Sequence, residues 1–133
     1  MKCNRGQETA DHRRMKELIA KLFTLLGYLV FFEEQLTDVV AWKLRSGGPR
    51  IVGIEAERSP RNVLRNVRRD LARGCNVVLV VAANENLQAA IRRKLQRELP
   101  PEHLRKIAVT TITRTERAIE RLETIHGNES QQL

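Results

Sequence analysis

Cysteine and histidine are scarce in this sequence, and their scarcity excludes two classes of protein. Its two cysteines, Cys3 and Cys75, are too few for a disulfide framework, so a reducing compartment such as the cytoplasm is the simplest expectation. There is no CxxC pair and no histidine-rich tract. The three histidines, His12, His103 and His126, are scattered in polar surroundings, and we expect them at the surface rather than around a metal.

Long apolar runs are also missing. No run approaches the roughly 20 residues that a membrane span requires, and the polar segment 1–10 has no signal-peptide core. Aromatic residues make up only 4% of the chain, which argues against a base-stacking platform. With 133 residues, the chain has room for one core, so we expect a single domain over residues 1–126 and a polar tail over 127–133.

Negative charge is scarce relative to positive charge. The chain has 24 lysines and arginines against 16 acidic residues, a formal net charge of +8, and 18 of the 24 cations are arginines. Arginine pairs bidentately with phosphate, so a polyanionic partner is expected, in the first place DNA. An excess of charge that serves solubility alone is the alternative.

The hydrophobic periodicity predicts helices and strands in the order αβββαβαβα. The three early strands have short links and must be antiparallel neighbours, whereas the later strands alternate with helices and extend the sheet in parallel. The sequence therefore predicts an α/β fold with a mixed central sheet flanked by helices. The expected strands are 28–32, 36–45, 51–57, 76–83 and 106–112; the expected helices are 11–26, 59–73, 84–99 and one opening at Thr113.

Three acidic residues lie at the ends of two predicted strands. Asp38 begins the second, while Glu55 and Glu57 end the third and share one face of it because they are two residues apart. A turn over 46–49 would place Asp38 opposite Glu57 and Val40 opposite Glu55. Converging carboxylates need compensation, and hard oxygen ligands favour Mg²⁺ or Mn²⁺. The alternative is a solvated face of an edge strand.

A basic helix is predicted directly after these acids. Ser59 and Pro60 are typical of a helix start. Four arginines fall within one arc of this helix, opposite its apolar residues: Arg61, Arg65, Arg68 and Arg69. An arginine stripe beside an acidic cluster favours phosphate binding, and a solvated basic face is the alternative.

At these residues the chain resembles the PD-(D/E)xK nuclease superfamily. The αβββαβ order over residues 11–83 matches that core, with Asp38 opening the second strand and Glu55-Ala56-Glu57 near the end of the third. The resemblance implies a restriction-endonuclease-like core and Mg²⁺-dependent cleavage of DNA. It implies catalytic and metal-binding roles for Asp38, Glu55 and Glu57, with Glu17 as a further metal ligand. The expected nucleic-acid contacts are Arg58, Arg61, Arg65, Asn66 and Arg69.

The chain departs from the superfamily pattern at Glu57, where lysine is usual. That lysine positions or activates water. Arg58, Arg61 or Arg69 could replace its charge, and Arg61 or Arg69 is favoured because Arg58 alternates to the other strand face, although arginine cannot act as a base. The expected function is metal-dependent phosphodiester hydrolysis. One alternative is a noncatalytic nucleic-acid-binding module on the same fold. Another is a subunit or interaction domain, including a homodimer, that pairs through Phe31, Phe32 and Trp42.

Overall fold

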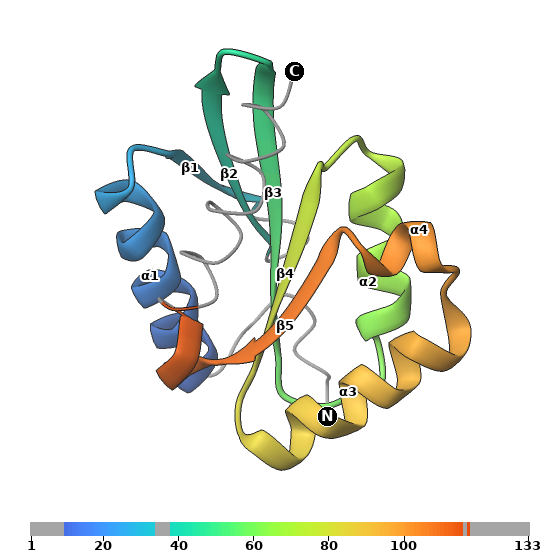
Figure 1. Cartoon of the computed structure of the whole chain (residues 1–133). Helices are drawn as coiled ribbons and strands as arrows, with labels where there is room; N and C mark the ends of the chain where they lie inside the picture. Colours follow the sequence, from blue (N-terminus) through green and yellow to red (C-terminus); the bar gives the residue numbers. More distant parts are fainter. Residues whose placement is uncertain (1–9, 34–37, 116, 118–133) are drawn as a thin grey trace.

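The computed structural model describes residues 10–33, 38–115 and 117, and the side chains in these ranges other than those of Asp11, Glu33 and Asp38. Five strands form one mixed sheet, and helices cover both of its faces (Figure 1). The strands are β1 (Leu29–Glu33), β2 (Asp38–Arg45), β3 (Gly48–Glu57), β4 (Val77–Ala82) and β5 (Ile107–Thr111). The helices are α1 (Ala10–Leu25), α2 (Val63–Ala72), α3 (Glu85–Glu98) and α4 (Pro101–Leu104), followed by the 3₁₀ turn η1 (Ile112–Arg114).

The order of strands in the sheet is the same as their order along the chain, β1 to β5. The pairs β1–β2 and β2–β3 are antiparallel, while β3–β4 and β4–β5 are parallel. Parallel neighbours need a crossover, which α2 supplies for the first pair and α3 with α4 for the second. The predicted mixed sheet flanked by helices is thus confirmed. The helix predicted from Thr113 onward lies largely outside the described residues, since 116 and 118–133 are not among them.

Helix α1 covers one face of β1, β2 and β3. Ile19 and Phe23 are buried at helical spacing, and the Phe23 ring meets Tyr28 edge-on at 5.1 Å between centroids. The helix ends before Gly27, whose φ of 91° is the left-handed conformation that glycine adopts easily. Leu18, next to Ile19 in the helix, is 44% exposed and lies outside this buried stripe.

The β2–β3 hairpin has a tighter turn than expected, and its register is different. Ser46 and Gly47 form the turn, so Arg45 pairs with Gly48 instead of Arg50. Gly48 allows this because its φ is 114°. Val40 consequently pairs with Gly53, and the predicted pairings of Val40 with Glu55 and Asp38 with Glu57 were wrong by two residues. A shift of two leaves each side chain on its expected face.

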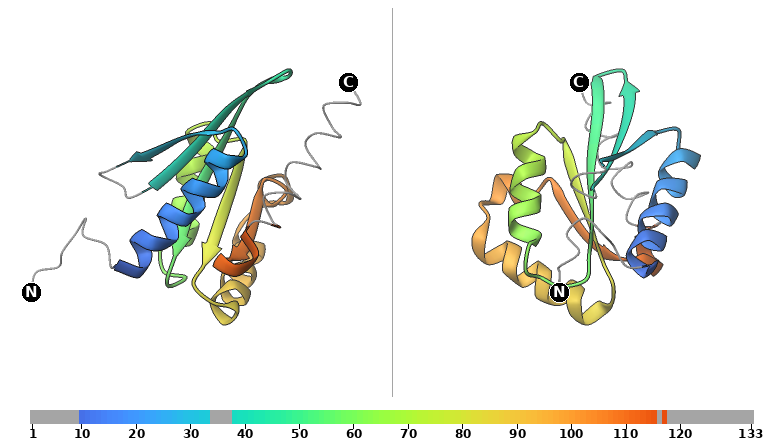
Figure 2. Two further views of the ribbon diagram at one scale, coloured as in Figure 1. Left: turned by 90° about the vertical axis from the view of Figure 1, so that its left-hand side faces the viewer. Right: turned by 180° about the vertical axis from the view of Figure 1, so that it is seen from behind.

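Two hydrophobic cores lie on opposite faces of the sheet. The first packs α1 against Val39, Ala41, Val52 and Ile54. The second packs α2 and α3 against the even-numbered residues of β4, whose odd-numbered residues belong to the first core. Every residue of β4 is therefore buried, in keeping with its continuous apolar sequence, which is typical of a strand covered on both faces. Figure 2 shows α1 and α2 on opposite sides of the sheet.

The helix ends were predicted with mixed success. Asn84 caps α3 as expected, accepting a hydrogen bond from the Leu87 amide. Helix α2 begins at Val63 with Asn62 at its N-cap, so the predicted start at Ser59 and Pro60 was wrong. The connection from β3 first bends over 58–60 and turns over 61–62 before the helix begins. Among the described residues, no helix has both the length and the apolar character needed to cross a bilayer.

Candidate functional site

The carboxyl end of β3 carries two buried carboxylates. Glu55 is 4% exposed and Glu57 8%, and both side chains lie on the sheet face that α2 covers. Alternation along the strand requires this, because Ile54, one residue before Glu55, packs in the core under α1. Burying two acidic side chains side by side is costly unless each has a partner.

Helix α2 supplies a partner for each carboxylate. An Nη2 group of Arg69 donates to Glu55 Oε2 at 3.0 Å, and Asn66 Nδ2 donates to Glu57 Oε2 at 3.1 Å. Asn66 and Arg69 are three residues apart and therefore project from the same side of the helix. The expected nucleic-acid contacts Asn66 and Arg69 are thus engaged with the acidic pair.

Helix α2 is rotated relative to its predicted orientation. Its buried residues are Val63, Val67 and Asp70, so the side toward the sheet is displaced from the apolar arc toward Asn66 and Asp70. This rotation removes Arg69 from the outer arginine stripe, where it was predicted, and leaves it only partly exposed above β3.

Asp70 is a third buried carboxylate that the sequence analysis missed. Its Oδ1 lies 3.6 Å from Arg69 Nε, and its buried Oδ2 has no hydrogen-bond partner among the described residues. It sits directly over Gly53, where a Cβ atom would come within 2.9 Å of Oδ2. A glycine inside an otherwise apolar strand indicates such a close approach and was the available signal. Arg69 therefore lies between two carboxylates, those of Glu55 and Asp70.

Asp38 is the first residue of β2, where its backbone pairs with Glu33 of β1. Its side chain is outside the described residues. The β2–β3 register ends with Val39 opposite Ile54, and continuing it by one residue leads from position 38 to position 55. The shifted register thus relates Asp38 to Glu55 rather than to Glu57.

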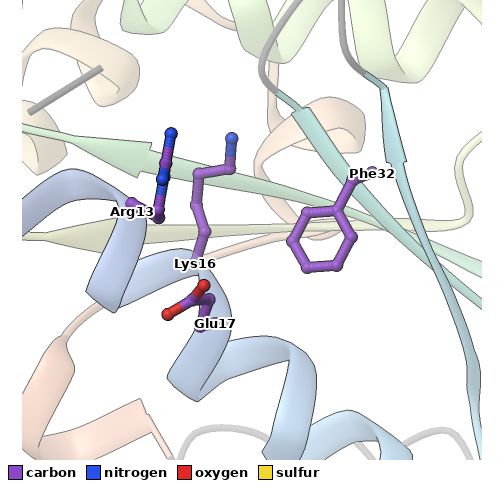
Figure 3. A pocket seen from close by; sticks show the side chains of 4 residues that line it. All are labelled: Arg13, Lys16, Glu17 and Phe32. Carbon is purple, nitrogen blue, oxygen red and sulfur yellow. The ribbon is translucent and has the colours of Figure 1, made fainter. Parts of the chain in front are cut away.

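Glu17 is not brought together with Glu55 and Glu57. It lies on α1, over the opposite face of the sheet, where it lines a cavity (Figure 3). His12, also on α1, is partly buried, with Nε2 at 2.9 Å from the carbonyl oxygen of Ala56. His12 is therefore less exposed than expected, because α1 turns it toward the carboxyl end of β3.

The remaining predicted nucleic-acid contacts flank the acidic pair. Arg58, Arg61 and Arg65 are exposed in the β3–α2 connection and on α2. Arg68 is also exposed, and its guanidinium approaches the Glu98 carbonyl at the end of α3. The buried acidic pair is thus followed along the chain by four exposed arginines, which we call the arginine rim: Arg58, Arg61, Arg65 and Arg68.

The predicted aromatic interaction surface is divided between two sides of the sheet. Phe31 and Phe32 are 55% and 49% exposed, but as neighbours in β1 they point to opposite faces. Trp42 pairs with Leu29 and shares the face of Phe31. Phe31, Phe32 and Trp42 therefore do not form one surface.

Comparisons with known proteins add no relative to this description. A scan against protein-family models finds no match, and searches of the curated proteins and of the solved structures find no significant match. Within the described part of the chain, no group of three or more histidine, cysteine or acidic residues is arranged to hold a metal ion. The nuclease resemblance therefore remains an expectation based on residues 11–83.

Proposed function

We propose that this protein is a metal-dependent nuclease that hydrolyses phosphodiester bonds in DNA at the Glu55–Glu57 end of β3. The observation that carries the proposal is the burial of both carboxylates on one sheet face beneath a helix with an exposed arginine rim. Apolar residues at these two positions would fill the core without the desolvation cost of burying carboxylates. A function that needs oxygen ligands accounts for the presence of this pair.

The chemistry of the donors fits Mg²⁺ or Mn²⁺, because carboxylate oxygens are the ligands these ions prefer. Asp38, Glu55 and Glu57 would hold the ion, which supplies an activated water and neutralises charge on the reacting phosphate. Glu17 is outside this set because α1 covers the other sheet face. Glu55 accepts a hydrogen bond from Arg69 at Oε2, so a metal ion bound to Glu55 would lie close to the guanidinium, whose positive charge opposes it.

The residues around the two carboxylates have separate roles in the proposed reaction. Asn66 holds Glu57 in a fixed orientation through its 3.1 Å hydrogen bond. Arg61 and Arg65 on the rim contact the DNA backbone, since exposed arginines bind phosphate without reading sequence. Arg69 supplies a cation beside the same carboxylates and takes the place of the usual lysine charge.

A noncatalytic nucleic-acid-binding module is the second candidate, and the Arg69–Glu55 ion pair favours it. That pair already compensates Glu55 without a metal. The absence of lysine at position 57 points the same way. In this case the arginine rim binds DNA with an affinity that falls steeply with salt, and no turnover occurs.

Cleavage assays distinguish the two functions. The purified chain is incubated with supercoiled plasmid, single-stranded DNA and RNA in Mg²⁺, Mn²⁺ or EDTA. We expect metal-dependent cleavage of DNA that Asp38→Asn and Glu55→Gln abolish, while Glu102→Gln, at an exposed acid of α4, leaves it unchanged. Binding without cleavage in every substrate selects the noncatalytic module. Cleavage that survives Asp38→Asn and Glu55→Gln contradicts the proposed site.

A further inference from the structure

A cavity of about 300 Å³ lies on the sheet face opposite Glu55 and Glu57, and the proposed function does not use it. It opens between α1 and β1 and is lined by Arg13, Lys16, Glu17 and Phe32 (Figure 3). Its volume is at the lower end of the range for small-ligand pockets. An occupant of one nucleotide or less would therefore fill it.

Two cations form one wall of this cavity. Lys16 and Arg13 are three residues apart on α1, and Figure 3 shows their nitrogen ends on the same side. Lys16 is only 6% exposed, although lysine normally keeps its ammonium group in water. A buried lysine and an exposed arginine thus bring two positive charges to the same wall of the cavity, where they attract an anion.

The opposite wall is aromatic. The ring of Phe32, a residue 49% exposed, has Lys16 Nζ 6.0 Å from its centroid. In sites for single-stranded nucleic acid, bases stack on aromatic rings while the phosphates contact neighbouring cations. One ring is not the platform of several rings that long strands use, but it serves a single base.

Glu17 completes the lining with the only carboxylate among the four residues. An ionised carboxylate accepts hydrogen bonds and repels phosphate, so it selects a ligand that also carries donors. Sugar hydroxyls and the exocyclic amino groups of bases are such donors. The four residues thus present complementary chemistry to a phosphate, a flat ring and a hydrogen-bond donor.

We propose that this cavity binds one nucleotide, with its phosphate on Arg13 and Lys16 and its base against Phe32. Glu17 accepts a hydrogen bond from the sugar or from the base amino group. The nucleotide is either free in solution or part of a single strand, and the recognising chemistry is the same. This site is independent of the acidic pair, because α1 and α2 lie on opposite faces of the sheet (Figure 2).

The proposal is tested by titrating the ¹⁵N-labelled full chain in EDTA, where metal-dependent cleavage cannot occur. The probes are 5′-AMP, adenosine, ribose 5-phosphate and a short single-stranded oligodeoxyadenylate. We expect 5′-AMP to bind at least about tenfold more tightly than either of its halves, because each half loses one wall of the cavity. Amide shifts should be largest in residues 13–17 and 29–32.

Matched variants separate the cavity from general electrostatic attraction. Phe32→Ala should weaken 5′-AMP binding about tenfold, whereas Phe31→Ala, at a similarly exposed ring on the other face, should leave it unchanged. Arg13→Ala, at an exposed position, should weaken it comparably and carries no risk to the core. Lys16→Met tests the contribution of the Lys16 ammonium group to binding, and the melting temperature of this variant is measured alongside.

Each outcome decides the matter. Tighter binding of the oligonucleotide, with the same sensitivity to Phe32→Ala, assigns the cavity to a strand; tighter binding of 5′-AMP assigns it to a free nucleotide. Equal losses for Phe31→Ala and Phe32→Ala, equal affinity for 5′-AMP and ribose 5-phosphate, or shifts confined to α2 overturn the proposal. Failure of the nuclease assay has no bearing on these results.

Discussion

The two faces of the sheet bury different chemistry, and β3 contributes to both. Toward α1 it presents Val52 and Ile54, which pack with apolar residues in the first core. Toward α2 the alternate positions are Gly53, Glu55 and Glu57, covered by a helix that adds a third acid. The α1 face shows that apolar packing is available to this strand. The acids of the α2 face therefore reflect a demand other than stability, since buried charges seldom stabilise a fold.

Phe23→Ala should produce the largest loss of stability. It tests whether apolar packing on the α1 face makes the main contribution to the free energy of unfolding. Phe23 is 1% exposed and packs on Tyr28. Removing a buried phenyl group costs about 3–4 kcal/mol of unfolding free energy through lost transfer energy and an unfilled cavity. Urea unfolding measures it. Leu25→Ala, exposed on the same helix, is the control and should change stability by less than about 0.5 kcal/mol. A loss below that of Leu25→Ala would contradict the assignment.

Arg69→Met should destabilise the α2 face by about 2–3 kcal/mol. The substitution keeps an unbranched side chain but leaves the buried acids Glu55 and Asp70 without their shared cation. The matched control is Arg65→Met, one turn away and exposed, which should have an effect near zero. Equal effects of the two substitutions would mean that the acids do not depend on Arg69.

The same variant sharpens the metal proposal. If the carboxylates bind Mg²⁺ or Mn²⁺, the ion and the Arg69 guanidinium compete for Glu55. Arg69→Met should then gain more in melting temperature from millimolar metal than the unaltered chain does, because ligands stabilise the state that binds them. Glu55→Gln, which removes the carboxylate in question, is the control. Identical shifts in melting temperature for Arg69→Met and the unaltered chain would contradict a metal site at Glu55.

The sequence predicted the elements of both faces better than the contacts between them. Gly27 and Asn84 indicated helix ends through local geometry, and the apolar run of β4 indicated burial on both sides. Register depends on which two residues make the turn, and Ser46–Gly47 was not distinguishable from a longer turn by composition. The rotation of α2 depends on packing against β3, which periodicity alone cannot supply.

Gly53→Ala should cost about 2 kcal/mol and tests whether Asp70 is held against the strand. A Cβ at position 53 would meet the Asp70 Oδ2, Cγ and Cβ atoms at 2.9, 3.0 and 3.1 Å, so α2 must move outward. Gly47→Ala, in the open turn of the hairpin, has nothing within 4 Å and is the matched control. If the double variant Gly53→Ala with Asp70→Ser restores stability, the close approach is the cause; no recovery would contradict it.

Asn66→Ala should have the smallest effect on stability, about 1 kcal/mol, and the most selective effect on the site. It removes the 3.1 Å donor to Glu57, leaving a nearly buried carboxylate oxygen without that hydrogen bond. Asn86→Ala, exposed in the first turn of α3, is the control and should be near neutral. Because Glu57 then loses a hydrogen bond that orients it, a nuclease would lose turnover with little change in DNA affinity, whereas a noncatalytic binder would show no change beyond the small loss of stability. Measuring affinity and cleavage on the same preparation therefore separates a positioned carboxylate from a merely buried one.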